Sequence, residues 1–315
     1  MQEHNRHPDA ALPRVFHLED ARAAGVTVGQ LRGSRFVRLG RGIYRQRALP
    51  FHSLEVYAAF CAANPDAHLS HVSAAHAWGL WLPPRITAGF PVHLSTAGPQ
   101  RNSPRQVNVV GHWSRIPPDF VREVNGLRLS SPAWTWTQLA GSGLGLPDLV
   151  AAGDALLQRS DGAERPPNVI GANPLATRDE VFDVLEMRKR FPGKRLALQA
   201  VSMLREGVDS RPESIVRQDL VKHRWPEPVV NFHLQTRCGV RAIDLAYPDQ
   251  RIAIQYEGRH HNSSEQLSRD ILRDAELEEI DWLTVRTDKT YFSDPNWGGF
   301  YDRLRTAFAR RKGTA

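Results

Sequence analysis

The chain has 315 residues, a length typical of about two domains. Hydrophobic residues make up 41% and charged residues 24%, which excludes a wholly disordered, collagen-like or coiled-coil protein. Its two cysteines are too few for a disulfide framework or a zinc ribbon, and no apolar run is long enough to span a bilayer. Residues 1–15 contain no apolar segment of the kind found in secretory signals. We therefore expect a cytoplasmic protein with no membrane partner.

Positive charge is concentrated at the start of the chain. The formal net charge is +7, and residues 1–50 alone carry nine arginines against four acidic residues. Codon usage in a GC-rich genome accounts for a high arginine content, but not for this clustering. A local basic cluster is typical of a protein that binds a polyanion.

Residues 1–50 are predicted to form a winged helix-turn-helix module. The pattern indicates a short helix over 18–25, a second helix capped by Thr27, and two strands over 36–44 that turn at 40–42. In a winged helix the second helix enters the major groove and the wing contacts phosphate. The arginines expected to bind DNA are Arg32, Arg35, Arg38, Arg41 and Arg45. The alternative is a scaffold with a solvated basic face.

Residues 51–157 are predicted to be a mixed α+β region. The expected helices are 52–64, 70–79, 131–140 and 146–159, and the expected strands are 91–96 and 106–113. His71 and His76 lie on one alanine-rich helix without a carboxylate at ligand spacing, so we interpret them as packing or capping residues. Trp78, Trp134 and Trp136 are interpreted as core residues. Residues 158–204 are predicted to be a linker followed by a helical connector that is interrupted at 192–193.

Residues 205–315 are predicted to be an α/β domain. Ser210, proline in the first turn and Glu213 are typical of a helix start, and this helix is expected to end at His223. The elements expected after it are strands at 229–235, 240–247 and 251–257, a helix to about 280, a strand at 282–286 and a helix at 296–311.

Oxygen-bearing side chains are predicted to converge in this domain. Gln255 and Glu257 share one face of their strand, and the turn at 248–250 brings Asp244 alongside them. Glu213, at the start of the preceding helix, can lean over the same place. Carboxylate and amide oxygens suit Mg²⁺, and a metal bound there predicts hydrolysis of phosphodiester bonds.

The same residues carry a family resemblance. The matching segments are SRPE at 210–213, RAIDLAYP at 241–248, IAIQYEGRHH at 252–261, Arg269-Asp270-x-x-Arg273 and WLTVR at 282–286. In this order they resemble the nuclease-like domains related to very-short-patch-repair (Vsr) endonucleases, in the PD-(D/E)xK restriction-endonuclease-like superfamily. The resemblance covers about residues 205–312. The N-terminal half more weakly resembles the winged-helix domain of AbiEi-type antitoxins.

The resemblance implies roles for individual residues. Asp244 would be the central metal ligand, with Gln255 where the family usually has Glu and Glu257 where it has Asp. Mg²⁺ or Mn²⁺ would be the cofactor. His261 falls near a histidine that Vsr-type enzymes use close to the scissile phosphate. The candidate phosphate contacts are Arg269 and Arg273, for which helix-surface ion pairs are the alternative.

Two functions follow as expectations. The first is a DNA-binding protein with a Mg²⁺-dependent endonuclease domain. The second is a non-catalytic, antitoxin-type DNA-binding regulator whose nuclease fold has become a scaffold. Gln255 favours the second because an amide removes one negative charge from the metal site. Whether a toxin-like protein or a second copy of the chain is a further partner stays open.

Overall fold

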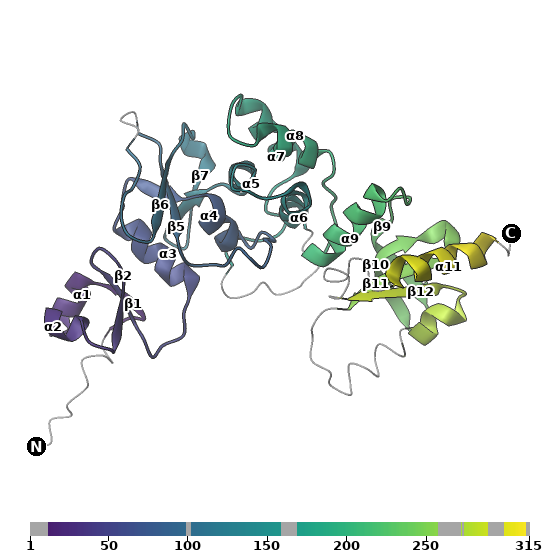
Figure 1. Ribbon diagram of the computed structural model, residues 1–315, viewed down its shortest axis with the longest axis horizontal. Coiled ribbons are helices and arrows are strands. Elements are labelled where there is room, and N and C mark those ends of the chain that lie inside the picture. The colour runs from purple at the N-terminus through teal and green to yellow at the C-terminus, as the bar shows by residue number, and fades with distance from the viewer. Residues whose placement is uncertain are drawn as a thin grey trace, which may run out of the picture. The chain divides into compact units, whose positions relative to one another are not determined.

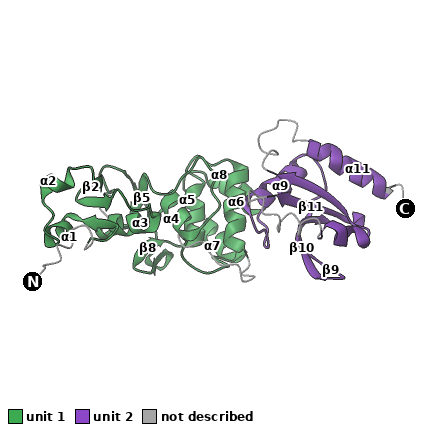
Figure 2. Cartoon of the chain, turned by 90° about the horizontal axis from the view of Figure 1, so that it is seen from below, with its two compact units in different colours: residues 1–202 green, residues 203–315 purple. Residues whose placement is uncertain are grey.

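The computed structural model describes residues 12–98, 102–158, 169–257, 272, 274–288 and 299–312. Helices and three sheets are present, which confirms the α/β class. The chain divides into two compact units, residues 1–202 and 203–315 (Figure 2). No helix within the described ranges is long and apolar enough to cross a membrane.

The first unit begins with a small three-stranded antiparallel sheet of order β1-β3-β2 (Figure 1). Its elements are β1 (Val15–His17), α1 (Leu18–Ala23), α2 (Val28–Leu31), β2 (Phe36–Gly40) and β3 (Ile43–Gln46). Thr27 caps α2, since its hydroxyl accepts a hydrogen bond from the Gln30 amide at 3.3 Å. Both predicted helices and both predicted strands are confirmed. β1, which was not predicted, adds the third strand.

A five-stranded mixed sheet forms the centre of the first unit, in the order β6-β5-β4-β8-β7. Its strands are β4 (Ala67–Leu69), β5 (Val92–Thr96), β6 (Val109–Trp113), β7 (Val121–Val124) and β8 (Leu127–Ser130). The β5·β6 and β4·β8 pairs are parallel and the other pairs are antiparallel. The strands predicted at 91–96 and 106–113 are confirmed as β5 and β6. β4 and the β7–β8 hairpin were not predicted.

Helices pack around this sheet. They are α3 (Ser53–Ala62), α4 (His71–Trp78), the 3-10 turn η2 (Pro118–Phe120), α5 (Pro132–Leu139) and α6 (Leu146–Leu157). Trp78, Trp134 and Trp136 are buried, as predicted. The Trp136 indole Nε1 donates to the Leu149 carbonyl at 2.8 Å, so burial leaves this polar atom satisfied.

The segment predicted as linker and connector packs into the first unit wherever it is described. Ile170 and Ala176 are buried, and the Ile170 amide donates to the Ala77 carbonyl at 2.8 Å. Two helices follow, α7 (Arg178–Met187) and α8 (Lys194–Val201). The predicted interruption at 192–193 is confirmed. Gly193 has φ +80° there, and an added Cβ would lie 2.1 Å from the Ala140 carbonyl oxygen, so only glycine fits.

The second unit is a four-stranded sheet, in the order β12-β11-β10-β9, with helices packed on it. Its elements are α9 (Arg211–Lys222), β9 (Val229–Thr236), β10 (Gly239–Tyr247), the turn η3 (Pro248–Gln250), β11 (Ile252–Glu257), β12 (Leu283–Asp288) and α11 (Phe300–Lys312). Residues 274–279 are also helical. β9, β10 and β11 form an antiparallel meander, and β12 pairs in parallel with β11. All four predicted strands are confirmed.

Two apolar clusters hold the second unit together. α9 and α11 share one cluster with the large residues of the strands, including Val216, Leu304 and Ile254. Leu277 belongs to the other cluster, together with Ala253. The helix start that carries Glu213 is thereby anchored to the strands that carry Asp244 and Gln255.

Candidate functional site

Glu213, Asp244 and Gln255 lie together in the second unit, and we call them the carboxylate pocket. Glu213 lies in the first turn of α9, whose N-cap is Ser210. The Ser210 hydroxyl accepts a hydrogen bond from the Glu213 amide at 3.4 Å and donates one to Glu213 Oε1 at 2.6 Å. The Asp209 amide donates to Glu213 Oε2 at 3.1 Å. The helix start therefore fixes the Glu213 carboxyl group.

Glu213 and Asp244 influence each other electrostatically. The Glu213 residue is only 9% exposed. Burial, followed by the negative charge of Asp244, raises the pKa of Glu213 to about 7. Glu213 is therefore about half protonated at neutral pH, which is unusual for a carboxyl group.

Asp244 lies where β10 and β11 separate. The paired residues of these strands end at Leu245 and Ile254. Beyond that point Asp244 Oδ2 accepts a hydrogen bond from the Tyr256 amide at 2.8 Å. The aspartate side chain thus replaces a backbone partner of β11, which holds its carboxylate at the edge of the gap.

Gln255 presents its amide nitrogen to Asp244. In the orientation that satisfies both side chains, this nitrogen donates to Asp244 Oδ1 at 3.2 Å and to Oδ2 at 3.3 Å. The Gln255 carbonyl oxygen was expected to serve as a metal ligand. In this orientation the Gln255 amide nitrogen, and not its oxygen, faces the Asp244 carboxylate.

Glu257 is engaged elsewhere. It lies at the exposed end of β11, and its carboxylate forms an ion pair with Arg286 of β12. Parallel pairing sets Arg286 beside Gln255, two residues before Glu257, and Arg286 also contacts Asp274 at 2.6 Å. Among the described residues of this unit, no three acidic, histidine or cysteine ligand atoms lie within 4.8 Å of one another. Glu257 is therefore bound by Arg286 rather than shared with Asp244 and Glu213, which differs from the expectation.

Three residues predicted from the family resemblance lie outside the described part of the chain. They are His261, Arg269 and Arg273.

The N-terminal arginines are largely exposed. Arg32, Arg35, Arg38 and Arg41 are exposed, whereas Arg45 is half-buried and donates to the carbonyl groups of Gln46 and Leu49 at 3.2 Å. Arg38 pairs across the sheet with Tyr44, and Arg45 pairs with Val37, so the two arginines project from opposite faces. The five arginines therefore do not form one flat surface.

The second N-terminal helix is a single turn. α2 has four residues, and Arg32 is its C-cap rather than part of its body. Arg35 follows in the turn before β2. Any DNA contact in this module therefore comes from arginines in turns and strands, because α2 is too short to fill a groove.

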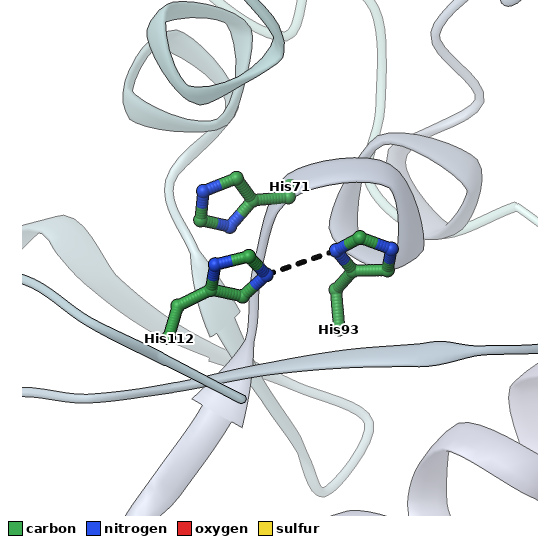
Figure 3. Close-up of side chains that lie close together, drawn as sticks. All are labelled: His71, His93 and His112. Carbon is green, nitrogen blue, oxygen red and sulfur yellow. Dashed lines mark hydrogen bonds between the residues drawn. The ribbon is translucent and has the colours of Figure 1, made fainter. Parts of the chain in front are cut away.

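A second group of chemically active side chains was missed by the sequence analysis. His71, His93 and His112 come together in the first unit, and we call them the histidine cluster (Figure 3). His93 Nδ1 lies 3.0 Å from His112 Nε2, and the His71 ring stacks on the His112 ring with centroids 3.7 Å apart. His71 was interpreted as an isolated packing or capping residue, but it is part of this cluster.

Strand pairing builds the histidine cluster. His93 and Ser95 lie two residues apart on β5 and so share a face, and parallel pairing sets His112 of β6 beside Ser95. α4 begins above that face with His71, whose φ of +49° is uncommon for a residue other than glycine. This backbone conformation costs roughly 1 kcal/mol or more and persists where the surroundings impose it, often at functional sites.

All three histidines are partly buried. Burial, with a smaller contribution from the neighbouring histidines, lowers the pKa of His71 to about 2 and that of His93 to about 4. Burial also lowers the pKa of His112. The three imidazoles are therefore neutral at physiological pH, the form in which histidine binds metals. The only sequence signal was the placement of His93 and His112 in predicted strands, since their neighbourhood depends on strand order.

A scan against protein-family models and a search of curated proteins each give no match to this chain. Its function is therefore inferred from its own residues and their geometry.

Proposed function

We propose that the chain binds DNA and hydrolyses its phosphodiester bonds at the carboxylate pocket with Mg²⁺ or Mn²⁺. The observation that carries this proposal is the convergence of Glu213 and Asp244: burial, and after it the Asp244 charge, raises the pKa of Glu213 to about 7. Two carboxyl groups that repel each other in a buried place are stabilised by a hard cation, so the donor set fits this class of metal.

Glu213 and Asp244 are the residues that would hold the metal. When bound, a divalent cation lowers the pKa of a water molecule and neutralises charge on the scissile phosphate. The Tyr256 amide orients the Asp244 carboxylate, while Ser210 and the Asp209 amide orient Glu213.

DNA binding is supported by the N-terminal arginines. Arg32, Arg35, Arg38 and Arg41 are exposed on a small, packed module. Arginine forms bidentate hydrogen bonds with phosphate, and neutralising phosphate releases counterions.

The test uses the full chain, supercoiled plasmid DNA and a titration of Mg²⁺ or Mn²⁺. We expect metal-dependent nicking that Asp244→Ala abolishes. The matched control is Asp249→Ala, because Asp249 is an exposed aspartate in the turn between the same two strands. Cleavage by Asp244→Ala at the wild-type rate would contradict the proposed site, and absence of cleavage with either metal would contradict the activity.

The contacts made by Gln255 and Arg286 favour a second candidate function. The Gln255 amide donates to Asp244, and Arg286 engages Glu257, so protein groups bind carboxylates that a nuclease would use for metal. This arrangement supports a DNA-binding regulator of the antitoxin type, with the second unit as a scaffold. Salt-dependent DNA binding without cleavage in any metal would decide for the regulator.

A further inference from the structure

We propose that His71, His93 and His112 bind one divalent transition-metal ion of the zinc class and leave its fourth coordination position open. One nitrogen from each ring lies within 4.8 Å of the others. This site belongs to the first unit and is independent of the carboxylate pocket and its proposed nuclease activity.

The spacing of the rings suits such an ion. Zinc binds histidine nitrogen at about 2.0–2.1 Å with tetrahedral angles, which separates two nitrogen ligands by about 3.3 Å. His93 Nδ1 and His112 Nε2 are 3.0 Å apart, so this pair is close to that spacing (Figure 3). His71, stacked on His112, has to tilt its ring to complete the set.

The donor atoms select the class of metal. The cluster offers three imidazole nitrogens, which suit zinc, copper, nickel and iron, whereas Mg²⁺ and Ca²⁺ require oxygen ligands. The two units therefore differ in the metals they would take.

Neighbouring groups hold the histidines in place. The His71 ring nitrogen that faces the other two histidines is Nδ1 (Figure 3), and the Ser70 hydroxyl lies 3.0 Å from it. The His71 amide donates to Gln138 Oε1 at 3.0 Å, and the His93 amide donates to the Ser73 hydroxyl at 2.9 Å. These two hydrogen bonds fix the backbone from which the His71 and His93 rings project.

The cluster opens into a cavity that supplies the fourth ligand. The cavity has a volume of about 610 Å³, and its described lining includes all three histidines, Arg85 and Arg188 but no acidic side chain. The Arg188 guanidinium lies 4.6 Å from the Trp134 ring centroid and 4.3 Å from that of Phe191. The positive charges of the metal and of Arg188 favour a water molecule or a small anion as the fourth ligand. Three protein ligands with one open position are typical of catalytic rather than structural zinc.

The experiment measures metal binding by the full chain, prepared without a histidine tag and stripped of metal with EDTA. Zn²⁺ affinity is measured by competition with a chromophoric chelator, and Co²⁺ is added as a spectroscopic probe of coordination number. We expect one Zn²⁺ per chain at the cluster and a four- or five-coordinate Co²⁺ spectrum. His93→Gln and His112→Gln should each lower Zn²⁺ affinity more than about 100-fold, since even the partners behind metal ligands are worth about 10–100-fold.

Two controls isolate the cluster. His76→Gln changes a half-buried histidine on the same helix that lies outside the cluster, so its Zn²⁺ affinity should equal that of the wild type. Asp244→Ala removes the central acid of the carboxylate pocket and should also leave Zn²⁺ affinity unchanged. Loss of Zn²⁺ binding in Asp244→Ala but not in His93→Gln would overturn the proposal.

A measurement on the unaltered chain covers the case in which the histidine variants do not fold. X-ray absorption at the zinc edge counts the imidazoles bound to the ion. Three imidazole nitrogens support the proposal, whereas one or none overturns it, as does absence of Zn²⁺ binding by the folded wild type. Near-ultraviolet circular dichroism establishes which variants are folded before their affinities are compared.

Discussion

The carboxylate pocket and the histidine cluster are both groups of side chains that can bind a cation, but they differ in charge. Each gathers side chains able to bind a cation on a frame of paired strands and a helix start. In the second unit the groups are carboxyls, and Asp244 acts against the ionisation of Glu213. In the first unit they are imidazoles, which burial keeps neutral. Without a metal, the two carboxyl groups repel each other when both are ionised, whereas the neutral imidazoles do not.

This difference predicts opposite responses to pH. A carboxyl group with a raised pKa stabilises the fold at low pH, and that stabilisation is lost as the pH rises through its folded pKa. A histidine with a lowered pKa stabilises the fold above its ordinary pKa, and that stabilisation is lost as the pH falls. A variant that removes the carboxyl group should therefore gain stability relative to the wild type as the pH rises. A variant that removes the histidine should gain stability relative to the wild type as the pH falls.

The largest effect is expected for Glu213→Gln without metal. Ionisation of Glu213 costs the wild type stability between its ordinary pKa of 4.5 and its folded pKa of about 7, and glutamine does not ionise. The stability of the variant relative to the wild type should rise by about 3 kcal/mol between pH 4 and pH 8. Urea unfolding in EDTA at each pH measures this change, and amide hydrogen exchange in β10 and β11 measures it locally. A difference that stays constant with pH would show that neither burial nor Asp244 raises the pKa of Glu213.

A smaller effect of opposite sign is expected for His93→Gln. The folded pKa of His93 is about 4 against an ordinary value of 6.5, so the wild type loses stability as the pH falls below 6.5. Glutamine does not titrate, and the variant should gain about 1–2 kcal/mol relative to the wild type between pH 7.5 and pH 5. Amide exchange in β5 and β6 in EDTA provides the measurement. Parallel pH profiles for variant and wild type would mean that the His93 ring stays in contact with water.

The second unit shows how much of a fold and site local patterns can predict. Ser210 and Glu213 identified the start of α9, because an N-cap hydroxyl and the amide that donates to it are only three residues apart. Alternation and the turn at 248–250 identified β10 and β11, and hence the neighbourhood of Asp244 and Gln255. Each of these features depends on residues close together in the sequence.

Contacts that depend on parallel strand pairing could not be predicted from local sequence patterns. Arg286 reaches Glu257 only because β12 pairs in parallel with β11, across a connection of about 25 residues. His93 meets His112 only because β5 and β6 are parallel neighbours, although both strands were predicted. Hydrophobic periodicity identifies a strand but does not identify its partner, so both contacts were invisible in the sequence.

The next effect in size is expected for Gln255→Glu, which replaces the amide beside Asp244 with a third carboxyl group. Without metal, the loss of the hydrogen bonds to Asp244 and the added repulsion should cost about 1–2 kcal/mol. With Mn²⁺ the added charge should tighten binding, restore the melting temperature and increase nicking of DNA. Melting with and without Mn²⁺, paired with a plasmid assay, tests both halves.

The matched control for that change is Gln250→Glu, in the turn between the same two strands. It adds the same charge outside the carboxylate pocket and should affect neither Mn²⁺ binding nor cleavage. A Gln255→Glu variant that melts lower, gains nothing from Mn²⁺ and cuts nothing would identify the second unit as a scaffold. The comparison between the two sites would then leave the histidine cluster as the chain's candidate metal centre.

The smallest effect is expected from the exposed arginines, because salt screens their charges. The double variant Arg32→Gln with Arg41→Gln removes two cations from the N-terminal module, and Arg122→Gln with Arg195→Gln removes two exposed cations elsewhere in the first unit. If the N-terminal arginines contact phosphate, the slope of log K against log salt should fall by ~0.9 for each lost contact, and only in the first pair. Fluorescence anisotropy with labelled duplex DNA over a range of NaCl concentrations measures the slope. Equal slopes for the two double variants would mean that the basic cluster is a solvated surface and that any affinity for DNA lies elsewhere.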